Sequence, residues 1–375
     1  MGLEPAFVGP WRLPPNRVAR FYRGGAALER FRTGEQGVDG ELPEDWVGSA
    51  THVWTRHGKP PGTDGLGWAE ADGERRRIDE LLAADPDAVA GSDLVAVAGL
   101  TTGLLVKLLD AGVRLPVHAH PTRAFARTHL DSFFGKAEAW IVLATRDTGD
   151  REGPTVRIGF RRDVGRAELV DLIEAEGTDA LLRAMHRRPT QAGDVWFIPP
   201  GVPHAIGAGV FMVEIEEPSD FSVVAETGGL PIEPEDAHLG LGWEVAVDAF
   251  DRAGHQDAWV DGLRHRPDRP AEGDGWRLGA LTGIDADPFF RPGRLEVRGR
   301  ARPDLGAPSF LVGVVTAGRG TVVAGGRELG LAAGDTFAVP AALLPEIEFG
   351  APDGLELIAC LPPRADELAR SRGGA

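Results

Sequence analysis

The feature of this chain that most constrains its fold is a short internal repeat. Residues 193–199 read GDVWFIP and residues 334–340 read GDTFAVP, so a Gly-Asp pair, an apolar stretch and a proline recur at the same spacing. Gly-Asp and proline are typical of the turns at the two ends of a short strand. A repeat of this kind predicts two strand-rich units that are built alike.

Short apolar segments that end in Gly, Pro or Asp recur along most of the chain. Examples are AWIVLATRD, TVRIGF, GVFMVEIEEP, FLVGVVTAGRG and LELIACLPP. This rhythm is typical of an antiparallel barrel or jelly roll. We therefore predict a mainly β protein with two jelly-roll barrels, one for each copy of the repeat.

Three other segments have the apolar spacing of helices. Residues 77–91 are amphipathic up to Pro86, residues 104–112 (LLVKLLDAG) end at a glycine, and residues 164–189 read as two short helices with a glycine between them. Lys107, in the second of these segments, is expected to reach solvent from the helix surface, with substrate binding as the alternative.

The predicted helices define a domain arrangement. The first copy of the repeat follows its preceding strand after a much longer interval than the second copy, and residues 164–189 account for the difference. We therefore expect residues 1–232 to form a first barrel with helical insertions at about 74–112 and 164–189. Residues 233–375 are expected to form a linker and a second barrel.

Four residues of the metal-binding type lie in strand-like surroundings in the first unit. They are His118 and His120 in VHAHP, Glu138 in GKAEAW, and His204 after the turn PPGVP. Alternation along a strand points both histidines of VHAHP to one face, and it does the same for Lys136 and Glu138. Three neutral imidazoles and a carboxylate suit zinc, iron, manganese or nickel. We predict one divalent metal ion, zinc foremost, with iron or manganese as alternatives.

The second unit lacks the residues for such a site. Pro345 stands at the position that corresponds to His204, and the segment FLVGVVTAGRGTVV contains no histidine. The second barrel is therefore expected to bind no metal in this manner.

Composition and the N-terminal sequence narrow the class of protein. A formal net charge of −17 disfavours nucleic acid and anionic membranes as partners, because both require a basic surface. The start MGLEPAFVGPW lacks the features of a signal peptide, and no apolar stretch is long enough to cross a bilayer. A soluble cytoplasmic protein is the expectation, with a small molecule as its partner and no sequence signal for its oligomeric state. Neither a P-loop nor a dinucleotide-binding fingerprint is present.

These residues resemble a known family, the type I mannose-6-phosphate isomerases of the cupin superfamily. The resemblance runs from about Tyr22 to Pro362. It is carried by LLVKLLDAGVRLPVHAHP, GKAEAWIVL, GDVWFIPPGVPHAIGAGVFMVEIEEPSD and a second unit without metal ligands. It implies two cupin barrels and a zinc-dependent aldose–ketose isomerase that interconverts mannose 6-phosphate and fructose 6-phosphate through an enediolate.

The resemblance also implies roles for individual residues. The family's zinc ligands in Val-Gln-Val-His-Pro fall on His118 and His120, its glutamate ligand in Gly-Lys-x-Glu falls on Glu138, and its last histidine ligand falls on His204. The family's substrate-site lysine falls on Lys136.

The same resemblance places one more residue at the site. Glu214, in VEIEE, matches an acidic position of the family site and is expected to shuttle the proton. Among the tryptophans, Trp46 and Trp140 are the ones expected near the substrate pocket.

Some positions depart from the family pattern. Val224 occupies the position of an active-site arginine, and Thr122-Arg123 stands where the family has Asp-Asp. A phosphate dianion needs cations, so we expect Arg123 or Arg127, which closely follow the VHAHP motif, to bind the substrate.

Three alternatives fit the same residues. The enzyme could isomerise a different or unphosphorylated sugar, since the arginine is missing. It could be a cupin dioxygenase with an iron site of three histidines and one glutamate, since His118 replaces the family's glutamine. It could also be a sugar-binding or regulatory relative without turnover.

Overall fold

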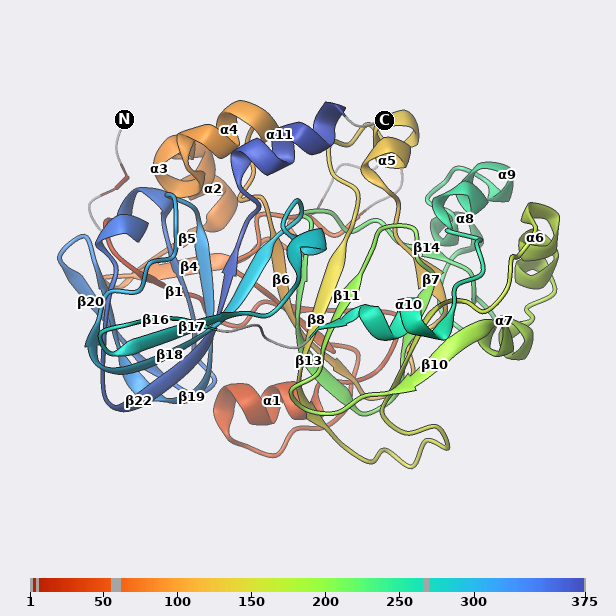
Figure 1. The fold of residues 1–375 in the computed structure, drawn as a ribbon, viewed down its shortest axis with the longest axis horizontal. Coiled ribbons are helices and arrows are strands. Elements are labelled where there is room, and N and C mark those ends of the chain that lie inside the picture. The colour runs from red at the N-terminus through yellow and green to blue at the C-terminus, as the bar shows by residue number, and fades with distance from the viewer. Residues whose placement is uncertain (1–2, 5–6, 55–61, 266–269, 374–375) are drawn as a thin grey trace.

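The computed structural model describes residues 3–4, 7–54, 62–265 and 270–373. It is built from three antiparallel sheets with short helices around them, which confirms the predicted mainly β class. Figure 1 shows two strand-rich halves side by side, with the C-terminal strands in blue on one side and helix α1 (Ala26–Thr33) below the junction.

A seven-stranded sheet forms one wall of the first half. Its strands are, in order, β15 (Arg264–His265), β11 (Val195–Ile198), β8 (Glu138–Thr145), β13 (Val210–Glu216), β6 (Leu105–Ala111), β3 (Glu44–Val47) and β2 (Arg17–Val18).

A five-stranded sheet faces it. Its strands are β10 (Met185–Pro189), β9 (Thr155–Phe160), β12 (His204–Ile206), β7 (His118–Ala119) and β14 (Val223–Val224). Trp140 and Met212 of the larger sheet share one buried cluster with Ile158 and Ile206 of the smaller sheet. The inner faces of the two sheets therefore pack on each other.

The second half consists of a ten-stranded sheet. Its strands are β16 (Ala271–Gly273), β17 (Trp276–Ala280), β18 (Arg291–Ala301), β22 (Glu348–Leu361), β19 (Leu311–Ala324), β21 (Thr336–Val339), β1 (Trp11–Arg12), β4 (Trp68–Ala71) and β5 (Glu74–Arg77), with β20 (Arg327–Ala332) beside β19. Three of these strands come from the N-terminal part of the chain, and β15 joins the sheet of the first half. Strands from both sides of residue 232 thus share sheets. The domain boundary expected at this residue stays a prediction.

The outer face of the seven-stranded sheet joins the two halves. Val106, Ile141 and Val213 from this face belong to the same buried cluster as Val312 and Ile358 of the ten-stranded sheet. Burial of so much apolar surface stabilises the junction and gives the seven-stranded sheet two covered faces.

Helices cover the ends and edges of the sheets. Besides α1 they are α2 (Ile78–Ala84), α3 (Pro86–Ala90), α4 (Ser92–Ala98), α5 (Arg123–His129), α6 (Arg166–Glu174), α7 (Thr178–Ala184), α8 (Pro234–Ala237), α9 (Trp243–Ala246), α10 (Asp257–Gly262) and α11 (Ala365–Gly373), with short 3-10 turns η2 (Val247–Ala249), η3 (Ile284–Ala286) and η4 (Ala341–Glu346). In the part of the chain that the structure describes, none of these helices has the length and apolarity needed to span a bilayer.

The predicted helical segments are partly wrong. Residues 105–111 form strand β6, not a helix, and residues 74–77 and 185–189 are strands as well. Every residue of β6 is buried, because the strand packs on both faces, and its sequence therefore lacks the alternation that marks a half-exposed strand. The two short helices expected within residues 164–189 are confirmed as α6 and α7.

Candidate metal centre

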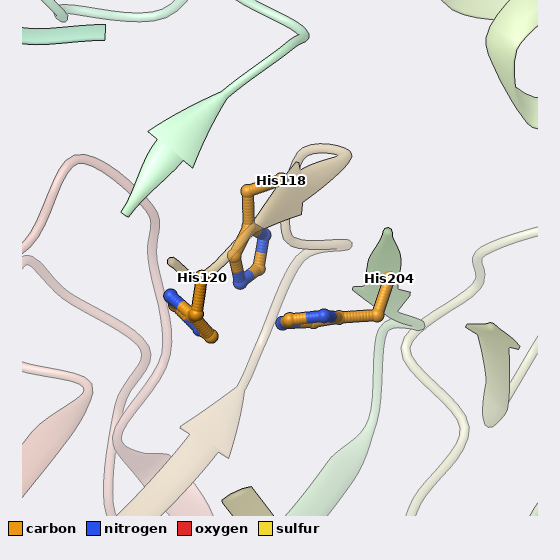
Figure 2. Close-up of side chains that lie close together, drawn as sticks. All are labelled: His118, His120 and His204. Carbon is orange, nitrogen blue, oxygen red and sulfur yellow. The ribbon is translucent and has the colours of Figure 1, made fainter. Parts of the chain in front are cut away.

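Three histidines meet on the inner face of the five-stranded sheet. His204 on β12 lies directly opposite His118 on β7, so both side chains leave the sheet on the same side. The centroids of these two rings are 4.2 Å apart, and the ring of His120 lies 5.0 Å from His118 and 4.9 Å from His204. Figure 2 shows the three rings converging on one space.

Hydrogen bonds fix the orientation of each ring. In all three histidines Nδ1 lies within hydrogen-bond distance of a backbone carbonyl oxygen, which makes Nδ1 the protonated nitrogen and leaves a lone pair on Nε2. The accepting carbonyls belong to Pro116, Phe221 and Val202, at 2.8, 2.6 and 2.8 Å. Such bonds orient imidazoles for metal ligation.

Glu138, the first residue of β8, brings a carboxylate from the opposite sheet. Its Oε1 lies 2.7 Å from Nε2 of His120, and its Oε2 lies 3.6 Å from Nε2 of His204. The indole N–H of Trp140 donates to Oε2 at 3.0 Å and holds the carboxylate in place. Both sheets therefore contribute to the site.

The donor atoms fit a metal ion. Nε2 of His204 is buried and has no hydrogen-bond partner among the described residues, a costly arrangement unless the lone pair is used. Burial lowers the pKa of His120 and of His204 to about 3, and burial together with His204 lowers the pKa of His118 well below its usual value. The rings are thus neutral at neutral pH, as metal ligands must be.

Glu138 is ionised under the same conditions. Burial disfavours its charged form, but His120 and Lys136 outweigh that effect and hold the pKa of this carboxyl well below its usual range. Lys136 lies beside it, with Nζ 3.0 Å from Oε1 of Glu138 and 3.3 Å from Nε2 of His120. The predicted shared face of Lys136 and Glu138 is consistent with this contact.

A buried network of charges extends from the candidate ligands. Nζ of Lys107 lies 2.9 Å from Glu216, 3.5 Å from Glu214 and 3.8 Å from Glu44, and Lys136 Nζ lies 3.2 Å from Glu216. All five residues are at most 3% exposed, so the expectation that Lys107 reaches solvent is wrong. Lys107 lies on strand β6 and faces the interior, so its ammonium group lies among carboxylates.

Two carboxyl groups of this network have raised pKa values. Burial and the charge of Glu138 raise the pKa of Glu214, and burial raises that of Glu216 well above its usual value although Lys107 and Lys136 oppose the shift. A carboxyl group whose pKa is shifted towards neutrality is suited to taking up and returning a proton.

A cavity of about 810 Å³ opens beside the histidines. Its lining includes Arg20, Arg23, Ser222 and Val224. Val224 on β14 lies opposite His118, and Oγ of Ser222 lies 3.4 Å from Nδ1 of His120, so both residues share the sheet face that carries the rings. The cavity therefore borders residues that contact His118 and His120, although none of the four candidate ligands is among its lining residues.

The residues predicted to bind substrate are not among the described residues that line this cavity, and their role stays a prediction. Arg123 is 7% exposed and donates to Glu217 at 2.5 Å, to the carbonyl of Pro288 at 2.8 Å and to the hydroxyl of Ser371. Arg127 is exposed on α5. Neither arginine is among the described residues that line the cavity.

Trp46 is likewise absent from the lining residues of this cavity. It is fully buried, its indole N–H donates to Glu44 at 2.7 Å, and Nζ of Lys107 lies 5.1 Å from its ring centroid. The tryptophan thus supports the charged network. Sequence reasoning had not identified Glu44 or Glu216 as site residues and had given substrate binding by Lys107 only as an alternative. The signal of Lys107 was a lysine within the otherwise apolar segment LLVKLL.

Comparison with known sequences gives relatives of one kind. No protein-family model matches the chain. A mannose-6-phosphate isomerase of Streptococcus mutans is 29% identical over 242 residues, which are 63% of this chain and 68% of the relative. The mannose-6-phosphate isomerase ManA of Bacillus subtilis is 33% identical over 117 residues, which are 31% of this chain and 34% of the relative.

Solved structures extend the likeness to nearly the whole fold. The mannose 6-phosphate isomerase of Bacillus subtilis matches with a TM-score of 0.68 and 20% identity, over 94% of this chain and 99% of its own. A zinc-bound mannose 6-phosphate isomerase matches with a TM-score of 0.67 and 13% identity, over 95% of this chain and 100% of its own. At these identities the comparison establishes a shared fold.

Proposed function

We propose that this chain, which is a relative of the mannose-6-phosphate isomerases, is a metal-dependent aldose–ketose isomerase that interconverts mannose 6-phosphate and fructose 6-phosphate. The observation that carries the proposal is the group of three neutral imidazoles whose Nε2 atoms converge beside Glu138 and next to a cavity of about 810 Å³. The cavity is linked to the site through two lining residues: Oγ of Ser222 lies 3.4 Å from Nδ1 of His120, and Nε of Arg20 lies 3.3 Å from Oε1 of Glu44.

His118, His120, His204 and Glu138 are the residues that would hold the metal. Zinc is the ion proposed, since the set of nitrogen and oxygen donors suits it and a solved structure with the same fold is zinc-bound. Once bound, the ion supplies Lewis-acid stabilisation of negative charge on the substrate oxygens.

Proton transfer is assigned to Glu214. Isomerisation removes the proton from C2 of the aldose and returns a proton to C1, and the reverse reaction exchanges these two roles. Glu214 has the raised pKa that suits a base in such a step, and Lys107 lies 3.5 Å from its Oε2 and orients the carboxylate. Lys136 is assigned to stabilising the negative charge that develops on O1 and O2.

All of these residues lie within residues 1–232, so we assign the chemistry to the first barrel of the proposed two. Residues 233–375 are assigned a supporting role, because they supply most strands of the ten-stranded sheet, which covers the outer face of the seven-stranded sheet. The proposed partner is a small sugar phosphate, and no nucleic acid is proposed.

An isomerase of unphosphorylated sugar is the second candidate, and a specific observation favours it. The cavity lining includes Arg20 and Arg23, but Glu41, Asp220 and Glu233 are also part of it, and Val224 adds no charge. Arg20 is itself paired with Asp220 at 3.3 Å. Arg23 is the lining cation that has no carboxylate partner among the described residues, since its guanidinium donates to the backbone carbonyl of Asp39. A lining with so little free positive charge suits an uncharged sugar.

The decisive experiment is a substrate panel. Zinc-loaded protein is assayed with mannose, fructose and glucose and with the 6-phosphate of each. The proposal predicts the highest kcat/KM for the mannose 6-phosphate and fructose 6-phosphate pair, and Arg23→Ala is expected to lower this value about ten- to hundredfold while leaving free mannose unaffected. Arg319→Ala, an exposed arginine on β19, is the control. Equal use of mannose and its phosphate selects the second candidate, and no turnover of any sugar rejects both.

A further inference from the structure

A second cavity lies at the junction of the two halves. It has a volume of about 690 Å³, and its walls come from α1, from the end of β8 and from strands β18, β19 and β22 of the ten-stranded sheet. Figure 1 shows α1 below the meeting point of the two strand-rich halves. None of the candidate metal ligands lines this junction cleft, so it is separate from the metal centre.

Arginine side chains dominate the charge of the junction cleft. Arg30, Arg146 and Arg294 are part of its lining, against one carboxylate, that of Glu356. Arg146 is paired with Asp39 at 2.7 Å and with a second aspartate. Within the described ranges the guanidinium groups of Arg30 and Arg294 have neither an ion pair nor a hydrogen bond, and Nε of Arg294 is buried without a partner.

The two unpartnered guanidinium groups differ in burial. Arg30 is exposed, whereas Arg294 is partly buried and its Nε is removed from water without a replacement hydrogen bond, a cost that a bound acceptor would recover. Glu356 does not fill that role, because its Oε1 accepts a hydrogen bond from Oγ1 of Thr316 at 2.7 Å and makes no ion pair with Arg294. In a chain with a net charge of −17, two free guanidinium groups at one cleft form a local site for an anion.

The remaining walls of the junction cleft are largely apolar. Phe31, Val142, Phe211 and Ile358 contribute to them. Apolar walls with a few convergent polar groups are typical of small-molecule sites. Arginine binds both carboxylates and phosphates through paired N–H groups, so the complementary ligand has an oxyanion at one end and an apolar body at the other.

We propose that the junction cleft is a binding site for a small organic oxyanion, a phosphate ester or carboxylate with an apolar body, held by Arg30 and Arg294. The site goes beyond the proposed isomerase activity, because it uses none of the residues assigned to that reaction. A ligand there contacts both halves and is expected to stabilise their junction.

The test measures binding and not turnover. Phenyl phosphate, benzoate and inorganic phosphate are titrated into the zinc-loaded full-length protein by calorimetry. Phenyl phosphate or benzoate is expected to bind with one site per chain and more tightly than inorganic phosphate, and the stronger of the two identifies the oxyanion. Arg30→Gln and Arg294→Gln are each expected to weaken binding about tenfold. Arg319→Gln, which removes an exposed arginine away from the cleft, is the matched control and is expected to bind like wild type.

A further variant separates loss of the site from loss of the fold. Ala144→Phe keeps both arginines but fills the cleft with a bulky ring, and it is expected to abolish binding while leaving the zinc content unchanged. Binding that persists in the Arg30→Gln/Arg294→Gln double variant, or binding that is lost in Lys136→Ala, would place the probe elsewhere and overturn the proposal. Binding by a protein that isomerises no sugar would reject the proposed function and leave this site standing.

Discussion

At the scale of single residues, Lys136 links two groups with different tasks. Its Nζ lies 3.0 Å from Oε1 of Glu138, a candidate metal ligand, and 3.2 Å from Oε1 of Glu216, a member of the buried acid network. Few water molecules screen charges at this depth, so an ammonium here strongly favours negative charge on its neighbours. The lysine therefore stabilises the ionised ligand and any anion formed from the substrate.

The first prediction separates ligand from electrostatic partner. Glu138→Ala is expected to lose both zinc and activity, because it removes a carboxylate that lies within 2.7 Å of one ligand nitrogen. Lys136→Ala is expected to keep zinc and to lower kcat by roughly a hundredfold or more, because it removes a cation beside the developing charge. Metal content by mass spectrometry and initial rates measure the two effects, with Arg319→Ala as the control. A fully active Lys136→Ala enzyme contradicts the role given to this lysine.

The second prediction concerns the base. Glu214→Gln keeps the size of the side chain but cannot accept a proton, so kcat is expected to fall by roughly 10²–10⁴ with zinc content unchanged. Because burial and Glu138 raise the pKa of Glu214, wild-type kcat should fall as the pH drops through that raised value, since the base becomes protonated. This acidic limb should be absent from the residual activity of the variant. The control is Glu296→Gln, an exposed glutamate on β18, and an unchanged pH profile in Glu214→Gln argues against the assignment.

Residue spacing alone predicted part of this site and missed the rest for a physical reason. His118 with His120, and Lys136 with Glu138, are two residues apart, and alternation puts each pair on one face of the chain whatever the rest of the fold does. Lys107 meets Glu214 through a strand register that joins distant segments, and no local spacing encodes such a register.

At the scale of elements, strand β6 and helix α5 determine how rigidly the site is held. β6 places Lys107 in the interior and is covered on both faces. α5 follows the VHAHP motif directly, and its first residue, Arg123, anchors it. Arg123 donates to Oε1 of Glu217, and Oε2 of the same carboxylate accepts the backbone N–H of Ala137, next to Glu138. The helix and the ligand-bearing strand are thus tied through one buried ion pair.

The third prediction follows from this ion pair. Arg123→Ala leaves Glu217 buried without its cation, and burial already raises the pKa of that carboxyl. The free energy of unfolding is expected to fall by about 3–5 kcal/mol, measured by urea denaturation. Arg127→Ala, four residues along the same helix and exposed, is the matched control and should change stability by no more than about 0.5 kcal/mol. A similar loss in both variants would mean that the helix itself, and not the ion pair, is responsible.

At the scale of the whole molecule, the repeat predicted two strand-rich units. It did not predict which segments of the chain contribute strands to each sheet. β1 has two residues and pairs with β21 through hydrogen bonds between segments more than 300 residues apart. A two-residue strand has no periodicity to detect, so the N-terminal strands of the ten-stranded sheet left no sequence signal. The candidate metal ligands could be predicted because they lie in recognisable local motifs, VHAHP, GKAEAW and the turn before His204.

The last prediction concerns the stability of the whole molecule as pH changes. The pKa of His120 and of His204 is about 3 in the folded, metal-free protein and about 6.5 in an unfolded chain. Between these values the unfolded chain binds protons that the folded protein does not. The histidines therefore contribute full stability above about pH 6.5 and progressively less as the pH falls towards 3. The raised pKa values of Glu214 and Glu216 act in the opposite direction, so the slope of the wild type alone is a mixture.

A comparison of two proteins isolates the histidine contribution. His118→Gln/His204→Gln keeps both acids but removes two of the buried imidazoles, so the free energy of unfolding of the metal-free variant should fall less steeply than that of wild type between pH 6.5 and 4.5. Zinc at roughly a thousand times its dissociation constant should add about 4 kcal/mol to wild type at pH 7.5. It should add progressively less in acid, because protons compete for the ligands, and nothing to the variant. Urea denaturation with zinc or with chelator measures all four cases. Equal slopes in the metal-free proteins would show that folding does not lower the pKa of these histidines, and an equal gain from zinc would show that they are not the ligands.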